Sequence, residues 1–342
     1  MAEFTRLVLV GTQRSGSNLL RLMLAQCDGV FAPPSAHEVE VLTSVGPFYG
    51  DLRSERACSR LVADMIELVR LNVLEWPENS LPTTEEVLEQ MRVGSVLGAY
   101  VALMDAAAAR VGSSTWVSKN LELYQFLTVQ DVEEYRLAPI HLVRDGRDVG
   151  LSFLKAPIGP KTPEVAGTQW RMDQEGCRAL RATLAIRYED LLAEPEEVFR
   201  AIGAAHPSVG RGNLKDFYLT SAARHAASRS NLWSNLDRPL MRNNAGRYRD
   251  TSAKSFVEAF ERVAFTELLR FGYQPLYALE ATPLSAQELE VATARDSLER
   301  RRHRLAADSE IEQLHVPQQQ WIDDLRGRAT RAMGAEGRES PI

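Results

Sequence analysis

The residues best suited to chemistry stand near the start of the chain, in a short stretch between two glycines. Gly11 and Gly16 are five positions apart, and the segment between them carries Arg14 and several hydroxyl side chains. Glycines at this spacing let the backbone curl, so that successive N–H groups point into one hollow. Such a hollow binds an anion, and Arg14 would add positive charge to it. The alternative interpretation is a turn between a core strand and a helix that binds no ligand.

The glycine spacing is that of a Walker A loop, the phosphate-binding loop of nucleoside triphosphatases. In this chain Ser17 occupies the position of the Walker lysine, and Asn18 occupies that of the magnesium-binding Ser or Thr. Because both of these residues are missing, the sequence disfavours a nucleoside triphosphatase. The positive charge lies inside the loop instead, on Arg14.

Further polar residues follow apolar runs later in the chain. Arg144 and Ser152 are eight residues apart, a spacing at which a strand end and the next helix could hold one phosphate from two sides. Lys119 closes another short apolar run, and His37 and Glu38 follow a segment broken by prolines. A histidine or a carboxylate can remove the proton of a hydroxyl group, and a lysine can stabilise negative charge that develops in a reaction.

These residues need a common framework, and the hydrophobic pattern indicates one. Short apolar runs predict five strands, at residues 7–10, 29–34, 115–120, 139–143 and 184–188. Longer amphipathic stretches predict helices after residue 18 and at 55–75, 83–111, 254–271 and 286–312. Strands alternating with helices form a parallel sheet, whose carboxyl edge is where α/β folds place their ligands. The sequence therefore predicts an α/β fold with a P-loop-like parallel sheet of about five strands flanked by helices.

Composition bounds the class of protein. The chain has 342 residues, of which 44% are hydrophobic and 25% charged, enough for one large core. The formal net charge of -6 argues against binding to nucleic acids or membrane surfaces, which favour a basic excess. Three scattered cysteines predict neither a disulfide framework nor a zinc site, and they favour a reducing cytoplasm. The N-terminus offers only a four-residue apolar run, so we expect no membrane span.

In their order and spacing, four stretches of the chain resemble the PAPS-dependent sulfotransferase family, where PAPS is 3'-phosphoadenosine-5'-phosphosulfate. These stretches are the loop Gln13-Arg14-Ser15-Gly16-Ser17-Asn18, the segment from Arg144 to Ser152, the run Arg187-Tyr188-Glu189-Asp190-Leu191 and the late loop from Arg242 to Arg247. The resemblance covers residues 7 to about 250 and is to the bacterial-type cytosolic members. Two positions depart from the family pattern, because Asn120 follows Lys119 and Tyr248 stands where tryptophan is usual.

The resemblance implies a role for each matching residue. Arg14 and Lys119 would stabilise charge on the oxygen that leaves, and His37, Glu38 or Glu40 would act as the base, with Glu38 second to His37. His37 is preferred because it closes a segment that matches the A-P-P-x-x-H pattern of many bacterial-type members. No metal ion is implied, and the product would be 3'-phosphoadenosine-5'-phosphate (PAP). The implied donor-binding residues are Arg14, Ser15, Gly16, Ser17, Asn18, Leu19, Arg144, Ser152, Tyr188, Arg242, Gly246 and Arg247.

We therefore expect an enzyme that transfers the sulfuryl group of PAPS directly, in line, to a hydroxyl of a small-molecule, carbohydrate or lipid-like acceptor. The alternatives are a P-loop kinase of a small metabolite and a nucleotide-binding protein without catalytic activity. We expect a sulfotransferase domain at residues 1–280, a C-terminal helical extension at 284–330 and a disordered tail at 331–342. Residues 222–250 are expected to form a long functional loop. The acceptor, the choice of base, a possible homodimer and the role of the C-terminal helix stay open.

Overall fold

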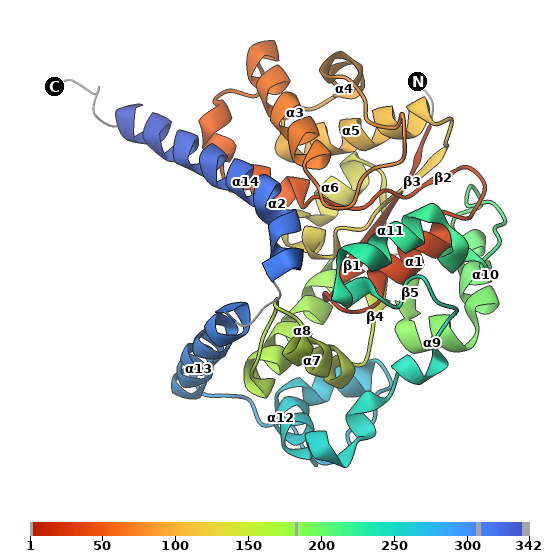
Figure 1. Cartoon of the computed structure of the whole chain (residues 1–342), viewed down its shortest axis with the longest axis vertical. Coiled ribbons are helices and arrows are strands. Elements are labelled where there is room, and N and C mark those ends of the chain that lie inside the picture. Colours follow the sequence, from red (N-terminus) through yellow and green to blue (C-terminus); the bar gives the residue numbers. More distant parts are fainter. Residues whose placement is uncertain (1–2, 182–183, 306–308, 337–342) are drawn as a thin grey trace.

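The centre of the molecule is a parallel β-sheet of five strands, seen in the computed structural model of the chain (Figure 1). The strands lie in the order β2-β3-β1-β4-β5, and all neighbouring strands run parallel. The structure describes residues 3–181, 184–305 and 309–336. The prediction of a five-stranded parallel sheet is confirmed. The strands are β1 Thr5–Gly11, β2 Val30–Phe31, β3 Thr115–Ser118, β4 Leu137–Val143 and β5 Leu184–Arg187.

β1 lies in the middle of the sheet because its apolar residues are buried on both faces. Leu7 and Leu9 pack into one hydrophobic cluster, and Val8 and Val10 pack into another on the opposite face. This pattern is typical of a parallel strand that is covered on both sides. β1 pairs with β3 on one side and with β4 on the other. The loops that follow these three strands therefore meet at one edge of the sheet.

Helices cover both faces of the sheet, as predicted. The α-helices are α1 Ser17–Leu24, α2 Glu38–Thr43, α3 Glu55–Arg70, α4 Thr84–Gln90, α5 Val96–Arg110, α6 Val129–Glu134, α7 Gly146–Lys155, α8 Pro163–Ala179, α9 Tyr188–Ala193, α10 Pro195–Ala205, α11 Ser221–Arg229, α12 Lys254–Arg270, α13 Ala286–Leu305 and α14 Ser309–Glu336. Helices α2 to α5 share a cluster with Val8 of β1, whereas α1 and α9 to α11 share the other cluster with Leu7. Helices α7, α8 and α12 pack together near the end of β4.

Short 3-10 helices connect several of these elements. They are η1 Gly46–Tyr49, η2 Leu121–Phe126, η3 Phe217–Leu219, η4 Asn231–Trp233, η5 Arg242–Asn244, η6 Arg247–Arg249 and η7 Thr251–Ala253. Of these, η4, η5 and η6 lie in the segment that the sequence predicted as one long loop. The first part of that segment is not a loop but helix α11, which Thr220 caps by accepting a hydrogen bond from the backbone N–H of Ala223.

The prediction of a single helix at residues 83–111 was wrong, because this stretch forms two helices, α4 and α5, with a non-helical segment between them. A side chain at Gly94 would place its Cβ 1.9 Å from the carbonyl oxygen of Leu52, so only glycine fits this close approach. Ser95 then starts a new helix by accepting a hydrogen bond from the N–H of Gly98 at 2.8 Å. Helices α6 and α8 were not predicted.

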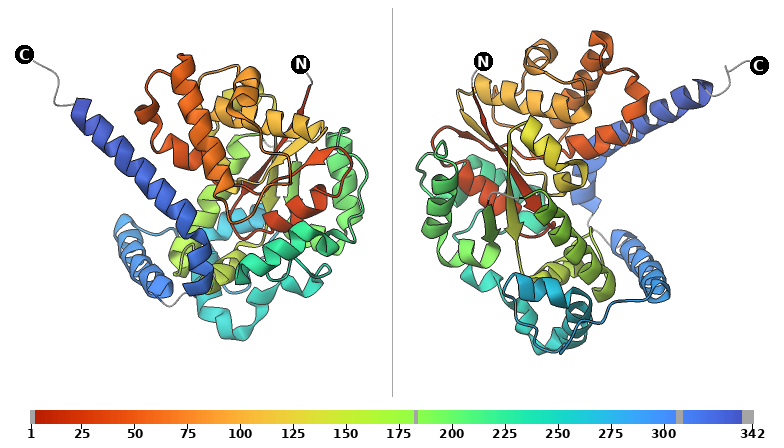
Figure 2. Two further views of the ribbon diagram at one scale, coloured as in Figure 1. Left: turned by 45° about the horizontal axis from the view of Figure 1, so that its top comes forward. Right: turned by 180° about the vertical axis from the view of Figure 1, so that it is seen from behind.

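The predicted C-terminal helical extension is present as two helices, α13 and α14, rather than one helix at 286–312. Helix α13 packs against α8, and α14 packs against η1 and α3. Figure 2 shows the free end of α14 projecting away from the body of the molecule. Because α14 ends at Glu336, the first six residues of the predicted disordered tail are helical. Residues 337–342 lie outside the described residues.

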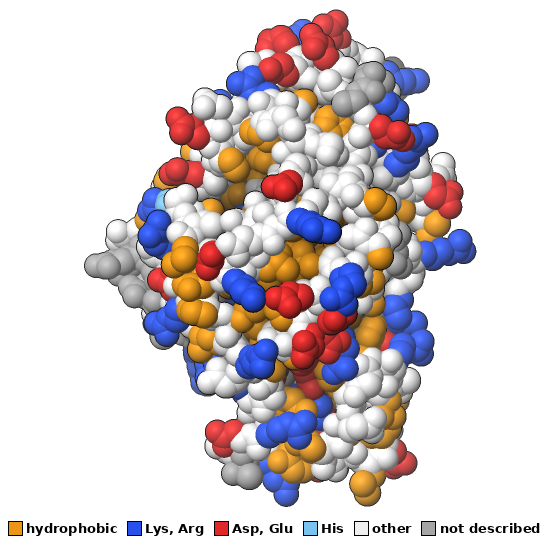
Figure 3. Space-filling model, turned by 90° about the vertical axis from the view of Figure 1, so that its right-hand side faces the viewer, with side chains coloured by type: hydrophobic (Ala, Val, Ile, Leu, Met, Phe, Trp, Pro, Cys, Tyr) orange, Lys and Arg blue, Asp and Glu red, His pale blue; other side chains and the backbone are white. Residues whose placement is uncertain are grey.

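Charged side chains of both signs share the surface of the molecule. On the face shown in Figure 3, Lys and Arg side chains are interspersed with Asp and Glu side chains and do not form one basic patch. Among the described helices, we find none with the length and apolar character that a membrane crossing requires. The three cysteines are unpaired.

Candidate functional site

The loop between β1 and α1 is shaped by its two glycines. Gly16 adopts a φ of 93°, and a Cβ at this position would lie 2.4 Å from the ring of Tyr188. A Cβ on Gly11 would lie 2.3 Å from the carbonyl oxygen of Leu142 in β4. Both positions therefore demand glycine, since any side chain would collide with a neighbour. The loop leads into the first turn of α1, whose partial positive charge would favour an anion in the loop.

A cavity of about 930 Å³ lies over this loop. Its lining includes all but two of the residues that the sequence predicted as donor-binding. One exception is Ser15, which is buried in the loop and whose hydroxyl has no hydrogen-bond partner. The other is Arg242, which is exposed and donates a hydrogen bond to the carbonyl of Ala193. Apolar side chains complete the wall, namely Leu151, Leu154, Leu192, Phe217, Leu232, Trp233, Leu236, Leu240 and Met241.

The side chain of Arg14 reaches from the first loop to two other parts of the cavity lining, Ser152 and Leu232. Its Nε donates to Ser152 Oγ in α7 at 3.1 Å, and its Nη2 donates to the carbonyl of Leu232 at 3.3 Å. Burial, together with the positive charge of Arg144, lowers the pKa of Arg14 to about 10. The guanidinium is still charged at neutral pH. Two cations held close together in a partly buried site favour the binding of an anion between or beside them.

Arg144, which follows β4, ties the first loop to the late loop. Its Nη1 donates to the carbonyl of Arg14 at 2.9 Å, and its Nη2 donates to the carbonyl of Asn244 at 2.8 Å. Its guanidinium lies over the ring of Tyr188, 4.5 Å from the centroid. The Nε of Arg144 is buried without a hydrogen-bond partner. An unsatisfied buried donor is rare in proteins, and here it lies in a residue that lines the cavity.

The late loop is held by Asp148, a residue that sequence reasoning missed. The Asp148 carboxylate accepts the backbone N–H groups of Gly246 at 2.7 Å and Tyr248 at 3.0 Å. Burial raises the pKa of Asp148, although the nearby Arg144 opposes this shift. The Gly246 amide is therefore already engaged within the protein. The sequence signal was present, because Asp148 stands one helical turn after Arg144.

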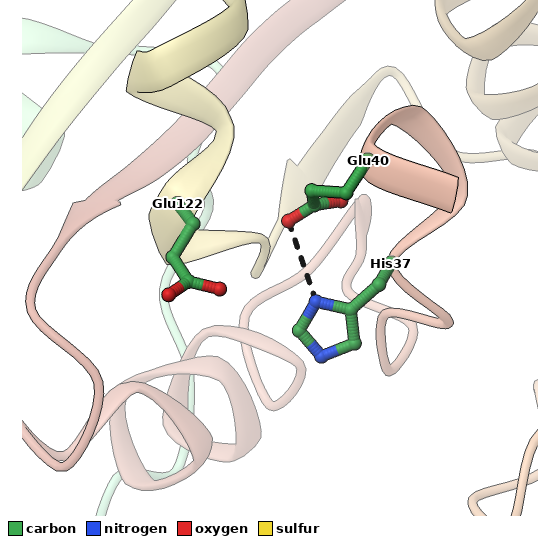
Figure 4. Close-up of side chains that lie close together, drawn as sticks. All are labelled: His37, Glu40 and Glu122. Atoms are coloured by element: carbon green, nitrogen blue, oxygen red, sulfur yellow. Dashed lines mark hydrogen bonds and ion pairs between the residues drawn. The ribbon is translucent and has the colours of Figure 1, made fainter. Parts of the chain in front are cut away.

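The predicted base, His37, lies outside the cavity lining, in a second group of polar residues. His37 precedes α2 with a left-handed φ of 61°, and its side chain is 49% exposed. Its Nδ1 lies 3.3 Å from Glu40 Oε1, as Figure 4 shows. The other oxygen of Glu40 accepts a hydrogen bond from Asn120 Nδ2 at 2.6 Å. Glu122 faces this pair from η2, and its Oε2 accepts from Gln13 of the first loop at 3.0 Å (Figure 4).

Charge sets the protonation of this group. Burial lowers the pKa of His37, but the hydrogen bond and the charge of Glu40 outweigh it, so the pKa is raised. Burial raises the pKa of Glu40, but its bonds to His37 and Asn120 reverse this effect, so the pKa is lowered. The ligand atoms of His37, Glu40 and Glu122 lie within 4.8 Å of one another, close enough that these three residues could hold a metal ion.

Glu38, the other predicted base, is used within the protein. It is only 1% exposed, and its carboxylate accepts from the N–H of Ala36 at 3.2 Å and the hydroxyl of Ser35 at 3.3 Å. Burial raises its pKa. Its carboxylate therefore stabilises the turn before α2.

Lys119 is not among the residues that line the cavity, although charges from both groups of polar residues act on it. Burial lowers its pKa to about 8, and the positive charges of Arg21 and Arg14 contribute to the shift. The carboxylates of Glu38 and Glu40 act in the opposite direction. Lys119 directly follows β3, whose last residue is Ser118.

Comparisons with known proteins identify structural neighbours. The solved sulfotransferase domain from the Synechococcus PCC 7002 olefin synthase has 20% sequence identity and a TM-score of 0.49, covering 76% of this chain and 94% of that chain. The sulfotransferase domain from the curacin biosynthetic pathway has 17% identity and a TM-score of 0.42, covering 86% of this chain and 98% of that chain. No protein-family model matches the sequence. No curated protein matches it either.

Proposed function

We propose that the chain is a PAPS-dependent sulfotransferase of the bacterial type. The observation that carries this proposal is the convergence of the glycine loop, Arg144 and Ser152 on one cavity of about 930 Å³. Two phosphate-binding elements in one cavity suit a nucleotide that carries phosphates at both its 3' and 5' positions. A kinase would need a lysine and a magnesium ligand in the loop, where this chain has Ser17 and Asn18.

Each wall of the cavity has a role in this proposal. The loop from Ser15 to Leu19 would bind the 5'-phosphosulfate, and Arg144, Ser152 and Arg247 would bind the 3'-phosphate. Tyr188 would lie beside the adenine. Arg242, which the sequence also predicted, is exposed and points to Ala193, so the proposal omits it.

The reaction moves a sulfuryl group from the phosphate oxygen of PAPS to an acceptor oxygen. The bond from sulfur to the bridging oxygen breaks as the bond to the acceptor forms, so negative charge grows on the leaving phosphate. Arg14 and Lys119 would stabilise this charge, which means that no metal ion is needed. His37 would take the acceptor proton. The acceptor would be a hydroxyl of a small molecule, a carbohydrate or a lipid-like compound.

His37 is the better candidate for the base because Glu38 is buried and engaged. We expect His37→Ala to lower kcat by roughly 10²- to 10⁴-fold, the usual contribution of a general base. PAP affinity should stay unchanged, because His37 does not line the cavity. Steady-state kinetics and calorimetry would measure the two effects separately. His315→Ala, at an exposed position of α14, is the matched control. A fully active His37→Ala together with an inactive Glu38→Gln would make Glu38 the base.

The proposed function is tested by calorimetric titration of the protein with PAP in the presence of a chelator, compared with ATP and magnesium. We expect PAP to bind without metal and ATP with magnesium to bind much more weakly. Binding of ATP with magnesium alone would exclude the sulfotransferase and favour the kinase. Metal-free binding of PAP without any sulfuryl transfer to a broad panel of hydroxyl acceptors would favour an inactive nucleotide-binding protein.

The proposal also covers the setting of the enzyme. Residues 1–280 would form the catalytic domain, and residues 284–330 would form a helical extension packed on it. The unpaired cysteines are compatible with a reducing cytoplasm, where we expect the protein to work.

A further inference from the structure

Asp296 is a buried carboxylate on a helix that is otherwise mostly exposed. Only 2% of it is accessible, although it belongs to α13 in the C-terminal extension. Its Oδ1 accepts the backbone N–H groups of Lys161 at 2.5 Å and Thr162 at 2.9 Å. Its Oδ2 accepts from Arg300 Nε at 2.5 Å. A buried carboxylate is costly unless it is paired in this way, so this contact is specific.

The contact caps the start of α8. Thr162 occupies the N-cap position of α8, but its own side chain makes no capping hydrogen bond. The hydroxyl of Thr162 instead lies 3.3 Å from Asp296 Oδ1. A negative charge at a helix N-terminus is favourable, because the first N–H groups lack partners within the helix. Helix α13 therefore supplies an acceptor for the N–H of the N-cap residue of α8 and for that of the residue before it.

Lys161 extends this contact to α7. Its amine donates to the backbone carbonyls of Phe153 at 2.5 Å, Ala156 at 2.5 Å and Ile158 at 2.9 Å, which belong to the last turn of α7 and the segment after it. The backbone of Lys161 is bound by Asp296, and its side chain binds the end of α7. The turn between α7 and α8 is thereby held from both sides.

Helix α7 is a wall of the cavity. Leu151, Ser152 and Lys155 of this helix line it, and Ser152 accepts the hydrogen bond from Arg14. Helix α8 contributes as well, because Trp170 Nε1 donates to the carbonyl of Arg144 at 3.1 Å. The elements that Asp296 holds together are thus the ones that place Ser152 and Arg144.

We propose that Asp296 is a positioning residue for the cavity, through which the C-terminal extension holds the α7 wall in place for donor binding. The extension is anchored at a second place, within α14, since Leu325 and Ala329 of this helix are buried in the cluster that includes α3. Figures 1 and 2 show α13 beside α8 and α14 crossing toward the helices around α3. The functional part of this inference rests on the proposed function, whereas the coupling of Asp296 to α7 does not.

The test compares Asp296→Ala with Asp296→Asn and with Glu290→Ala, an exposed carboxylate on the same helix. Loss of the cap should speed amide hydrogen exchange at Lys161, Thr162 and the end of α7 by roughly tenfold in Asp296→Ala. The affinity for PAP should fall by about fivefold. Asp296→Asn keeps an acceptor oxygen and a residue that caps helices well, so it should retain most of both properties. Glu290→Ala should match the wild type.

Two results would overturn the proposal. One is that Asp296→Ala shows the same rate of amide hydrogen exchange in α7 and the same PAP affinity as the Glu290→Ala control. The other is a lowered Tm in Asp296→Ala with unchanged PAP affinity, which would make Asp296 a structural residue only. If the wild type itself binds no PAP, the proposed function fails. The exchange at Ser152 and its neighbours then decides by itself whether Asp296 holds the cavity wall. If Asp296→Ala does not fold, hydrogen exchange and PAP affinity are compared between Asp296→Ser and Asp296→Asn instead.

Discussion

Arg144→Ala is expected to lose at least about 100-fold in affinity for PAP, because charge-assisted hydrogen bonds contribute about 1.5–3 kcal/mol each and 1.4 kcal/mol is a factor of ten. The guanidinium would contact the 3'-phosphate from the end of β4. Its removal also breaks the bonds to the carbonyls of Arg14 and Asn244, so the first loop and the late loop lose their common anchor. Calorimetric titration with PAP at fixed ionic strength measures the loss.

Two further arginine variants sharpen this experiment. Arg144→Lys keeps the positive charge but lacks the planar fork, so its affinity should lie between those of the wild type and Arg144→Ala. Arg262→Ala removes an exposed arginine of α12 that pairs with Glu258, and it should bind PAP as the wild type does. Unchanged PAP binding in Arg144→Ala would place the phosphate site away from the end of β4.

Lys119→Met is expected to lower kcat by roughly 10²- to 10³-fold, as the loss of one group that stabilises transition-state charge commonly does. Methionine keeps much of the length of the side chain but removes the ammonium. The affinity for PAP should fall much less than kcat does, because Lys119 would act mainly on the negative charge that develops on the bridging oxygen as the sulfuryl group leaves. Lys215→Met is the matched control, since this lysine lies at the surface beside Glu196. A Lys119→Met variant that loses PAP affinity and keeps its kcat would assign Lys119 to binding instead.

The same lysine predicts the alkaline limb of the pH profile. Burial lowers the pKa of Lys119 to about 8, so the ammonium is present below this pH and is lost above it. We therefore expect kcat/KM to fall about tenfold per pH unit above pH 8. In Lys119→Arg this limb should disappear, because arginine stays charged throughout this range. A limb that persists in Lys119→Arg would belong to another group.

Much of the candidate site could be predicted from the sequence because its features are local. The apolar run of β1 and the two glycines that follow it stand next to each other in the chain, and each glycine position excludes a side chain. Lys119 and Arg144 directly follow β3 and β4, so the parallel sheet brings them to the same edge. To predict that Lys119 and Arg144 lie at this edge, it was enough to identify the strands that precede them.

The contacts of His37 could not be predicted in the same way. Glu40 is three residues away, but Asn120 precedes η2, Glu122 lies within η2, and Gln13 comes from the first loop. Nothing in the periodicity of the chain indicates that these side chains meet. The sequence also could not show which way the Arg242 side chain points, because this depends on how η5 packs against α9.

The sequence by itself determined the parallel α/β fold, the glycine loop and the charged residues that follow the strands. It did so because backbone geometry and strand burial constrain the residue types within a few consecutive positions. Only the tertiary structure decided that Asp148 holds the late loop, that Glu40 bonds to Asn120 and that Asp296 binds the N–H of Thr162, 134 residues before it. Such contacts join groups that lie far apart in the chain, and their energy depends on packing that no local pattern of residues records.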